Sequence, residues 1–354
     1  MRAEPVRSPL PSPPTEDEGD PRLVELISAE IEAHGPISFA RFMERALYEP
    51  GLGYYATSND QTTRAGDFLT APELHPIFGQ VVARQIGEMR ERLGNPTDFT
   101  VREYGAGRRT LGRALPDDVR YQPIEFKDAR PAQAFTGVVL ANEFLDALPV
   151  HRLIHHDGAD LAELLVGRSE GKFVDVETEI TDDRLLAFLE RHQIAIHANE
   201  IVEVNLGVVD WLAEIRLDLE RGFVLILDYG GSHPTGTLRA FREQHVSSDV
   251  LGGVGHQDLT ANVDFDALGT EALAAGFEVL GRVRQAEFLL NAGLDEAYAA
   301  ARVEADQDWD SALNLRAAVR RLLDPSGMGG FQVIILGKAV DREPPLSGLV
   351  KRAV

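Results

Sequence analysis

The chain has 354 residues, of which 35 are lysine or arginine and 57 are aspartate or glutamate, so its formal net charge is −22. This charge excludes proteins that wrap a nucleic-acid backbone or lie on an anionic membrane, because both attract basic patches. The absence of cysteine excludes disulfides, thiol nucleophiles and cysteine-ligated metals. With 44% hydrophobic residues, the chain can form one large globular domain or a domain with an insertion.

The apolar runs are too short for a membrane-spanning helix. The longest cover residues 223–227 and 333–336, whereas a spanning helix needs about 20 residues. Residues 1–20 are rich in proline and acidic residues and lack the apolar core of a signal peptide, which predicts a disordered tail. We therefore expect a cytoplasmic protein without membrane insertion.

Three helices and a long loop are predicted before residue 99. Asp20-Pro21 is typical of a helix start, and apolar residues follow it at helical spacing. Ser38 is expected to cap a second helix over 39–48, and apolar residues from 78 to 93 predict a third. The loop over 51–73 is long enough to be functional or mobile.

From residue 99 onwards, short apolar runs alternate with helical stretches. The runs cover 99–104, 121–126, 137–141 and 222–228. This alternation favours a parallel sheet with helices on both faces. A β-hairpin is predicted over 152–176. A helix over 204–219 presents one apolar face, which could serve dimerisation or packing within the chain.

These patterns predict four parts along the chain. They are a tail over 1–20, a helical region over 21–98, an α/β domain over 99–340 and a C-terminal tail over 341–354. The α/β domain carries an insertion around 152–220, which we expect to cap the sheet rather than form a second independent domain.

The sharpest local motif is Glu103-Tyr104-Gly105-Ala106-Gly107, a predicted strand running into a glycine-rich turn and then a helix. Glycines let the backbone approach a ligand, and a helix N-terminus offers unpaired N–H groups. A tight turn with no ligand explains the motif equally well. Glu125, about 20 residues on, favours binding, because an acid at that place in a doubly wound fold hydrogen-bonds ribose hydroxyls. By itself, Glu125 is typical of a solvated strand-end acid.

A second group of polar residues follows the strand predicted over 137–141. Asn142, Glu143 and Asp146 come where that strand ends, and ligands of open α/β sheets bind at the carboxyl ends of strands. Two carboxylates there could hold a guanidinium and orient a nitrogen nucleophile. The alternative is structural, with Asn142 capping a following helix and Asp146 on its solvated face.

Several motifs in a fixed order carry a wider resemblance. They are Gly53-Tyr54-Tyr55, Gly66-Asp67-Phe68-Leu69-Thr70-Ala71-Pro72-Glu73, Glu103-Tyr104-Gly105-Ala106-Gly107, Asn142-Glu143-Phe144-Leu145-Asp146, Asp228-Tyr229-Gly230 and Gln257-Asp258-Leu259-Thr260. In these residues the chain resembles the MidA / NDUFAF-seven family of S-adenosylmethionine-dependent methyltransferases. The resemblance spans nearly the whole chain beyond the tail.

The resemblance implies a class I methyltransferase-like (Rossmann-like) α/β sheet with an N-terminal helical region and an inserted cap segment. It implies S-adenosylmethionine as the cofactor and methyl transfer to a protein side-chain nitrogen such as arginine. Because the mitochondrial members assist assembly of respiratory complex I, a complex I subunit is one expected partner.

The family's motifs also assign expected roles to residues of this sequence. By resemblance, Glu103, Gly105, Gly107 and Glu125 bind the cofactor, and Asn142, Glu143 and Asp146 are catalytic. Gly66 and Asp67 are also expected to bind the cofactor, and they belong to a loop expected to cover the cofactor and acceptor as a lid. No metal site is predicted, because the ten histidines are scattered without further ligands.

Two departures from the family pattern leave an alternative open. Arg109 stands where the family has the last glycine of its turn, which is expected to narrow the cofactor site. The span after Glu125 also leaves little room for the helix and third strand that normally hold adenine. The alternative function is therefore a catalytically degenerate member acting as an assembly or protein-binding factor. A nicotinamide-dependent oxidoreductase is disfavoured by the Asn142–Asp146 signature.

Overall fold

The computed structural model of the protein describes residues 18–57, 70–126, 128, 131, 133–156, 161–194, 196–242, 245–305 and 308–350. Most of the tail predicted over 1–20 lies outside these ranges. So do Gly66 and Asp67, the two residues expected from the lid loop. Within the described ranges, no helix is long and apolar enough to cross a membrane.

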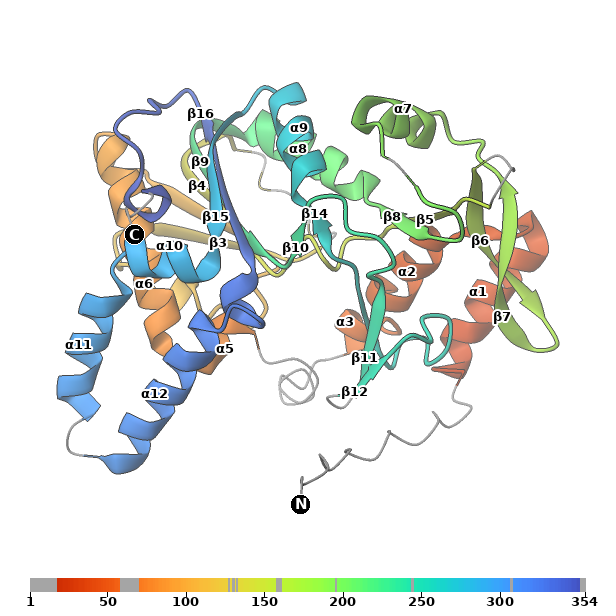
Figure 1. Ribbon diagram of the computed structural model, residues 1–354, viewed down its shortest axis with the longest axis horizontal. Helices are drawn as coiled ribbons and strands as arrows, with labels where there is room; N and C mark the ends of the chain where they lie inside the picture. The colour runs from red at the N-terminus through yellow and green to blue at the C-terminus, as the bar shows by residue number, and fades with distance from the viewer. Residues whose placement is uncertain are drawn as a thin grey trace, which may run out of the picture.

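A six-stranded sheet forms the centre of the molecule (Figure 1). Its strands, in spatial order, are β15 (Glu278–Arg284), β16 (Gln332–Lys338), β9 (Leu219–Asp228), β4 (Phe135–Asn142), β2 (Thr100–Tyr104) and β3 (Arg120–Ile124). The last four are mutually parallel, while β16 runs antiparallel to both its neighbours. The predicted parallel arrangement is thus confirmed for these four strands, and β3 and β15 are the edge strands of the sheet.

Helices cover both faces of this sheet, as the alternating side chains of its strands require. On one face, Val138 and Leu140 of β4 pack in a core with α6 (Pro76–Arg92), which is the third predicted helix. On the other face, Val139 and Ala141 pack with α8 (Leu206–Asp218). The remaining helices around the sheet are α9 (Phe265–Ala274), α10 (Gln285–Asn291), α11 (Leu294–Ala305) and α12 (Trp309–Leu323).

The structure shows whether the apolar face of the helix predicted over 204–219 packs within the chain or is free for dimerisation. The helix is shorter than predicted, because Val204 ends strand β8 and Leu219 begins β9. Its apolar side, including Trp211 and Leu212, is buried against the central sheet. That face therefore packs within the chain and is not available for dimerisation.

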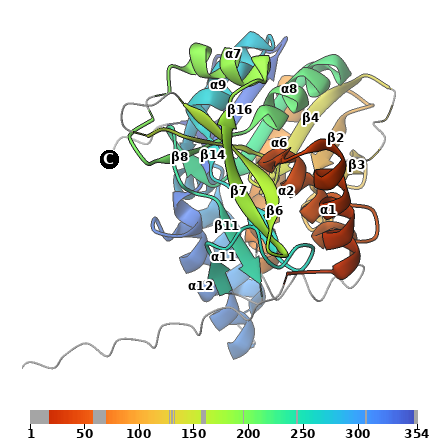
Figure 2. The ribbon, with the colours of Figure 1, turned by 90° about the vertical axis from the view of Figure 1, so that its right-hand side faces the viewer.

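A second sheet and two N-terminal helices form a smaller layer beside the central sheet. This sheet contains β1 (Ile37–Ser38), β6 (Ala162–Ser169), β5 (His151–Ile154) and β8 (Ile201–Val204) in that order, with β7 (Lys172–Glu179) paired to β6. Figure 2 shows the β6–β7 hairpin with α1 (Pro21–His34) beside it. The helix α2 (Phe39–Tyr48) shares their core, and α7 (Asp183–His192) follows the hairpin. The predicted hairpin is therefore present within the insertion.

The remaining short elements lie in the connections between these helices and strands. They are α3 (Tyr54–Thr57), α5 (Ala71–Leu74), β10 (Gly230–Gly231), β11 (Arg239–Arg242), β12 (His245–Ser247), β13 (Asp258–Thr260), β14 (Val263–Asp264) and three 3₁₀ turns over Gly112–Ala114, Met328–Gly330 and Ser347–Leu349. The segment predicted as a C-terminal tail packs on α6, since Leu346 is buried and the Ser347 hydroxyl donates to Glu88 at 2.6 Å.

The helix predicted after the glycine-rich turn is absent from the described residues 105–119. Only the single 3₁₀ turn Gly112–Ala114 forms there before β3 begins. Glycines at 105, 107 and 112 and a proline at 116 disfavour an α-helix in so short a connection. This turn therefore offers a ligand its own backbone rather than a helix N-terminus, contrary to the prediction.

Candidate active site

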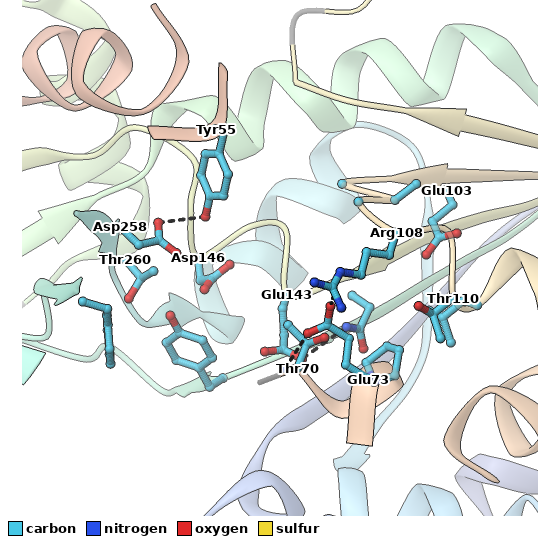
Figure 3. Close-up of a pocket in the computed structure, with 18 of the residues that line it drawn as sticks. Tyr55, Thr70, Glu73, Glu103, Arg108, Thr110, Glu143, Asp146, Asp258 and Thr260 are labelled. Atoms are coloured by element: carbon cyan, nitrogen blue, oxygen red, sulfur yellow. Dashed lines mark hydrogen bonds and ion pairs between the residues drawn. The ribbon is translucent and has the colours of Figure 1, made fainter. Parts of the chain in front are cut away.

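A cavity of about 270 Å³ lies where β2, β4 and β9 end at their carboxyl edges (Figure 3). The glycine-rich turn lines it together with Asn142, Glu143 and Asp146, which follow β4. Tyr229, which follows β9, also lines it, as do Asp258 and Thr260 of β13 and residues of α5. The structure thus brings the two polar motifs of the sequence to one place.

A second cavity, of about 300 Å³, adjoins the first and shares Tyr55, Gly105, Gly107 and Glu143 with it. Glu125 lines this second cavity, next to the aromatic rings of Phe126 and Tyr48, whose centroids are 4.0 Å apart. Seven of the nine expected site residues therefore line two adjoining cavities. The other two, Gly66 and Asp67, lie outside the described residues.

The glycine-rich turn has a backbone that few other residues tolerate. Gly105 has a φ of 66° and Gly107 a φ of 48°, both in the left-handed region. A Cβ atom at Gly105 would come within 3.0 Å of the Phe144 ring. The Gly107 N–H donates to Oε1 of Glu125 at 2.8 Å, so that carboxylate fixes the turn against the end of β3.

Glu103 is buried at the end of β2, beneath this turn. The Tyr121 hydroxyl of β3 donates a hydrogen bond to its carboxylate. Burial raises the pKa of Glu103 to about 7; the Tyr121 hydrogen bond opposes this shift, and the nearby charge of Glu125 adds to it. Glu103 can therefore change its charge near neutral pH.

The turn after β4 is held by a carboxylate from the neighbouring strand. Asp228, fully buried at the end of β9, accepts the backbone N–H groups of Phe144 at 3.2 Å and Leu145 at 2.9 Å. Glu143 itself has a φ of 49°, a left-handed conformation that is costly for a residue with a Cβ. Asp228 belongs to a motif of the family resemblance, and the structure gives it this positioning role.

Two carboxylates project into the first cavity with incomplete partners. Oε1 of Glu143 accepts from the Ala71 N–H at 3.2 Å and from Asn142 Nδ2 at 3.3 Å. Its Oε2, like Oδ1 of Asp146, is buried and has no hydrogen-bond partner among the described residues. Burial, followed by the charge of Asp146, raises the pKa of Glu143 to about 8. Burial also raises the pKa of Asp146.

The sequence predicted only part of the lining of this cavity, and two tyrosines complete it near Asp146 and Asp258. The Tyr55 hydroxyl donates to Oδ1 of Asp258 at 2.8 Å (Figure 3). The Tyr229 hydroxyl hydrogen-bonds Asp146. Both tyrosines belong to motifs of the family resemblance, but neither is among the nine predicted site residues.

Arg108 and Glu73 are further lining residues. Glu73, at the start of α5, closes a capping box with Thr70, and its Oε1 lies 3.3 Å from Nε of Arg108. Arg109, by contrast, is exposed and lines neither cavity, so the expectation that it narrows the site is wrong. Its φ of 57° shows why the family pattern has glycine at this position. One of the two departures behind the degenerate alternative is thereby removed. The other, the short span after Glu125, remains, because β4 already begins at Phe135.

The residues of the two cavities fit S-adenosylmethionine, a cationic molecule with a ribose diol. Glu125 and the rings of Phe126 and Tyr48 suit an adenosyl group, since a carboxylate binds hydroxyls and aromatic rings stack on a base. The other carboxylates of the first cavity, such as Glu103, suit the positive charges of the rest of the molecule. In the described ranges, no cluster of three or more histidine, aspartate or glutamate side chains could hold a metal.

Comparison with known proteins agrees with this fit. Residues 112–283 match a family model described as "Putative S-adenosyl-L-methionine-dependent methyltransferase". A Drosophila melanogaster relative, the mitochondrial NDUFAF7 homolog named as a protein arginine methyltransferase, is 30% identical over 88% of this chain and 84% of its own. The human mitochondrial protein arginine methyltransferase NDUFAF7 is 27% identical over 80% of this chain and 75% of its own.

A solved structure is similar over almost the whole fold. It is a Burkholderia thailandensis protein crystallised with S-adenosyl-homocysteine, 29% identical, with a TM-score of 0.80 over 93% of this chain and 95% of that one. The class I methyltransferase-like fold predicted from the sequence is thus confirmed. The chain belongs to the family of S-adenosylmethionine-dependent methyltransferases that includes the NDUFAF7 proteins.

Proposed function

We propose that this methyltransferase acts on a guanidinium nitrogen of an arginine in a protein. The observation that carries the proposal is the pair Glu143 and Asp146, whose unpartnered buried oxygens face the cavity shared with the glycine-rich turn. The printed names of the relatives, protein arginine methyltransferases, support it. The net charge of −22 also supports a basic protein acceptor through long-range steering.

A guanidinium matches these two carboxylates in charge and geometry. Its planar N–H groups form paired, charge-assisted hydrogen bonds to carboxylate oxygens. Burial alone favours the protonated form of Glu143 at neutral pH, since its pKa is about 8. An entering guanidinium lowers that pKa by its opposite charge, so both carboxylates ionise as they pair with it.

The carboxylates then orient one nitrogen and receive its proton. When bound, S-adenosylmethionine supplies an electrophilic methyl group, whose bond to sulfur breaks with both electrons remaining on sulfur while the N–C bond forms. Asp146 holds the guanidinium plane so that the nitrogen lone pair faces that methyl, and it accepts the proton that the methylated nitrogen releases. Tyr229, hydrogen-bonded to Asp146, fixes the carboxylate during this step.

The test is transfer of a deuterated methyl group to protein arginine. Purified protein is incubated with labelled S-adenosylmethionine and protein extracts from cells that lack its gene, and methylarginine is measured by mass spectrometry. We expect labelled methylarginine with the wild type. With Asp146→Asn we expect at least about 100-fold less, although S-adenosyl-homocysteine binding stays within about threefold. Label on lysine, histidine or small molecules would refute arginine as the acceptor.

A finer proposal places the acceptor among the subunits of respiratory complex I, and it rests on the family resemblance alone. The same labelled extracts test it by peptide mapping. Labelled methylarginine in a complex I subunit supports the finer proposal. Labelled methylarginine confined to other proteins refutes it and leaves arginine methylation standing.

A further inference from the structure

The first cavity is strongly unbalanced in charge. Five carboxylates line it, from Glu73, Glu103, Glu143, Asp146 and Asp258. Arg108 is the one lysine or arginine among the described lining residues. Among the described lining residues, an anionic group that enters this cavity therefore meets repulsion from every ionised carboxylate and the attraction of a single cationic side chain, Arg108.

The guanidinium of Arg108 is held loosely where it lies. It reaches from the glycine-rich turn towards Glu73 (Figure 3), and Nε is 3.3 Å from Oε1 of that residue. Nε is nevertheless buried and makes no hydrogen bond within the described part of the chain. A buried donor without a hydrogen bond is costly, so the Arg108 guanidinium can bind a better-placed acceptor.

Glu73 does not depend on Arg108 for its own position. Its Oε2 accepts from the Thr70 N–H at 3.4 Å, which closes the capping box of α5. Arg108 can therefore leave Glu73 without disrupting the start of α5. The ion pair between them, partly exposed at both ends, is the kind that contributes little on its own.

The cofactor brings one carboxylate, on its methionine part. An adenosyl group beside Glu125 in the second cavity would place the methionine part next to Gly105 and Gly107 in the first, because both cavities share these glycines. Its ammonium finds carboxylates there, but its carboxylate needs a cation.

We propose that Arg108 binds the carboxylate of S-adenosylmethionine, exchanging its contact with Glu73 for a paired hydrogen bond to the ligand. Arginine suits this role because its planar fork matches both carboxylate oxygens. The cavity thereby accepts a zwitterionic methionine group in surroundings that otherwise select for cations. Arg108 is a binding residue that discriminates the cofactor from molecules with the same adenosyl sulfonium but no carboxylate.

The test compares two ligands that differ only in that carboxylate. Isothermal calorimetry measures the Kd of S-adenosylmethionine and of its decarboxylated form for the wild type and for Arg108→Gln. We expect the wild type to bind S-adenosylmethionine about 10- to 100-fold more tightly than the decarboxylated form. In Arg108→Gln that ratio should fall to within about threefold, chiefly because the carboxylate-bearing ligand binds more weakly.

Two further variants separate this role from a structural one. Arg109→Gln changes the neighbouring exposed arginine and should keep the wild-type ratio. Glu73→Gln preserves the capping box but removes the competing charge, so it should tighten S-adenosylmethionine binding and leave the decarboxylated form unchanged. Circular dichroism confirms that each variant is folded. Equal weakening of both ligands by Arg108→Gln, or the same loss of discrimination in Arg109→Gln, would overturn the proposal.

Discussion

Replacing Glu143 by glutamine should stabilise the protein in a pH-dependent way while removing its methyltransferase activity. The glutamine oxygen can still accept from the Ala71 N–H and from Asn142 Nδ2, as Oε1 of Glu143 does at 3.2 and 3.3 Å. The substitution therefore removes the ionisable proton and the buried charge but keeps the shape. Functional sites often carry such a cost in stability.

The magnitude follows from the raised pKa. Burial, followed by the charge of Asp146, moves the pKa of Glu143 from 4.5 to about 8 in the folded protein. Between these two values the unfolded chain has lost the proton and the folded protein still holds it, so stability falls as pH rises. Each unit costs about 1.4 kcal/mol, which gives a loss of about 1 kcal/mol at pH 5 and about 4 kcal/mol at pH 8.

Urea unfolding at the two pH values measures this loss without cofactor. The free energy of unfolding of Glu143→Gln, minus that of the wild type, should grow by about 3 kcal/mol from pH 5 to pH 8. Any constant cost of burying the amide cancels in this comparison. Glu278→Gln, at an exposed position on β15, is the matched control and should show no such growth. A difference that is the same at both pH values would refute the reasoning.

Two further predictions concern the glycine-rich turn and its support. Arg109→Gly relieves a left-handed φ of 57° at an exposed residue and should raise the free energy of unfolding by about 1 kcal/mol. The affinity for S-adenosyl-homocysteine should stay unchanged within about twofold. Tenfold tighter binding would show that Arg109 does obstruct the site. Affinity for S-adenosylmethionine should rise as pH passes about 7, where Glu103 ionises and attracts the ammonium. Tyr121→Phe removes the hydrogen bond that favours the ionised form of Glu103. Calorimetry from pH 6 to 9 should therefore place the midpoint of the rise in affinity about one pH unit higher than in the wild type. An unmoved midpoint would contradict this role of Glu103.

Local sequence patterns predicted the starts of the first two helices, because a helix cap depends only on neighbouring residues. The Asp20 side chain accepts the Arg22 N–H at 2.9 Å and the Ser38 hydroxyl oxygen accepts the Arg41 N–H at 3.1 Å, both as the cap residues indicated. Helical periodicity predicted the wrong ends for α8, which adjoins a strand on each side. Val204 and Leu219 continue the helical spacing of α8, yet they belong to β8 and β9, because spacing alone does not show where backbone pairing begins.

The sequence predicted those site residues that lie at the end of a strand. Glu103, Glu125 and Asn142 come where β2, β3 and β4 end, and parallel strands bring such ends together. Contacts between distant segments could not be predicted in this way. Tyr55 and Asp258 are 203 positions apart, and their hydrogen bond depends on how the N-terminal region packs against β13. The Arg108 contact with Glu73 likewise joins two segments far apart in the sequence, the glycine-rich turn and α5.

The cluster of carboxylates also explains how ligand charge and protons must be coupled in this cavity. Glu103 and Glu143 have raised pKa values because burial removes the water that would stabilise their charges. Protons therefore neutralise them when no ligand cation is present, and a bound sulfonium, ammonium or guanidinium replaces those protons. Binding of the cofactor and of a cationic acceptor must then release protons, and each ligand lowers the electrostatic cost of leaving the remaining carboxylates ionised. An acidic cavity that is costly to the free protein is, for this reason, suited to a cationic cofactor and to the guanidinium acceptor that we propose.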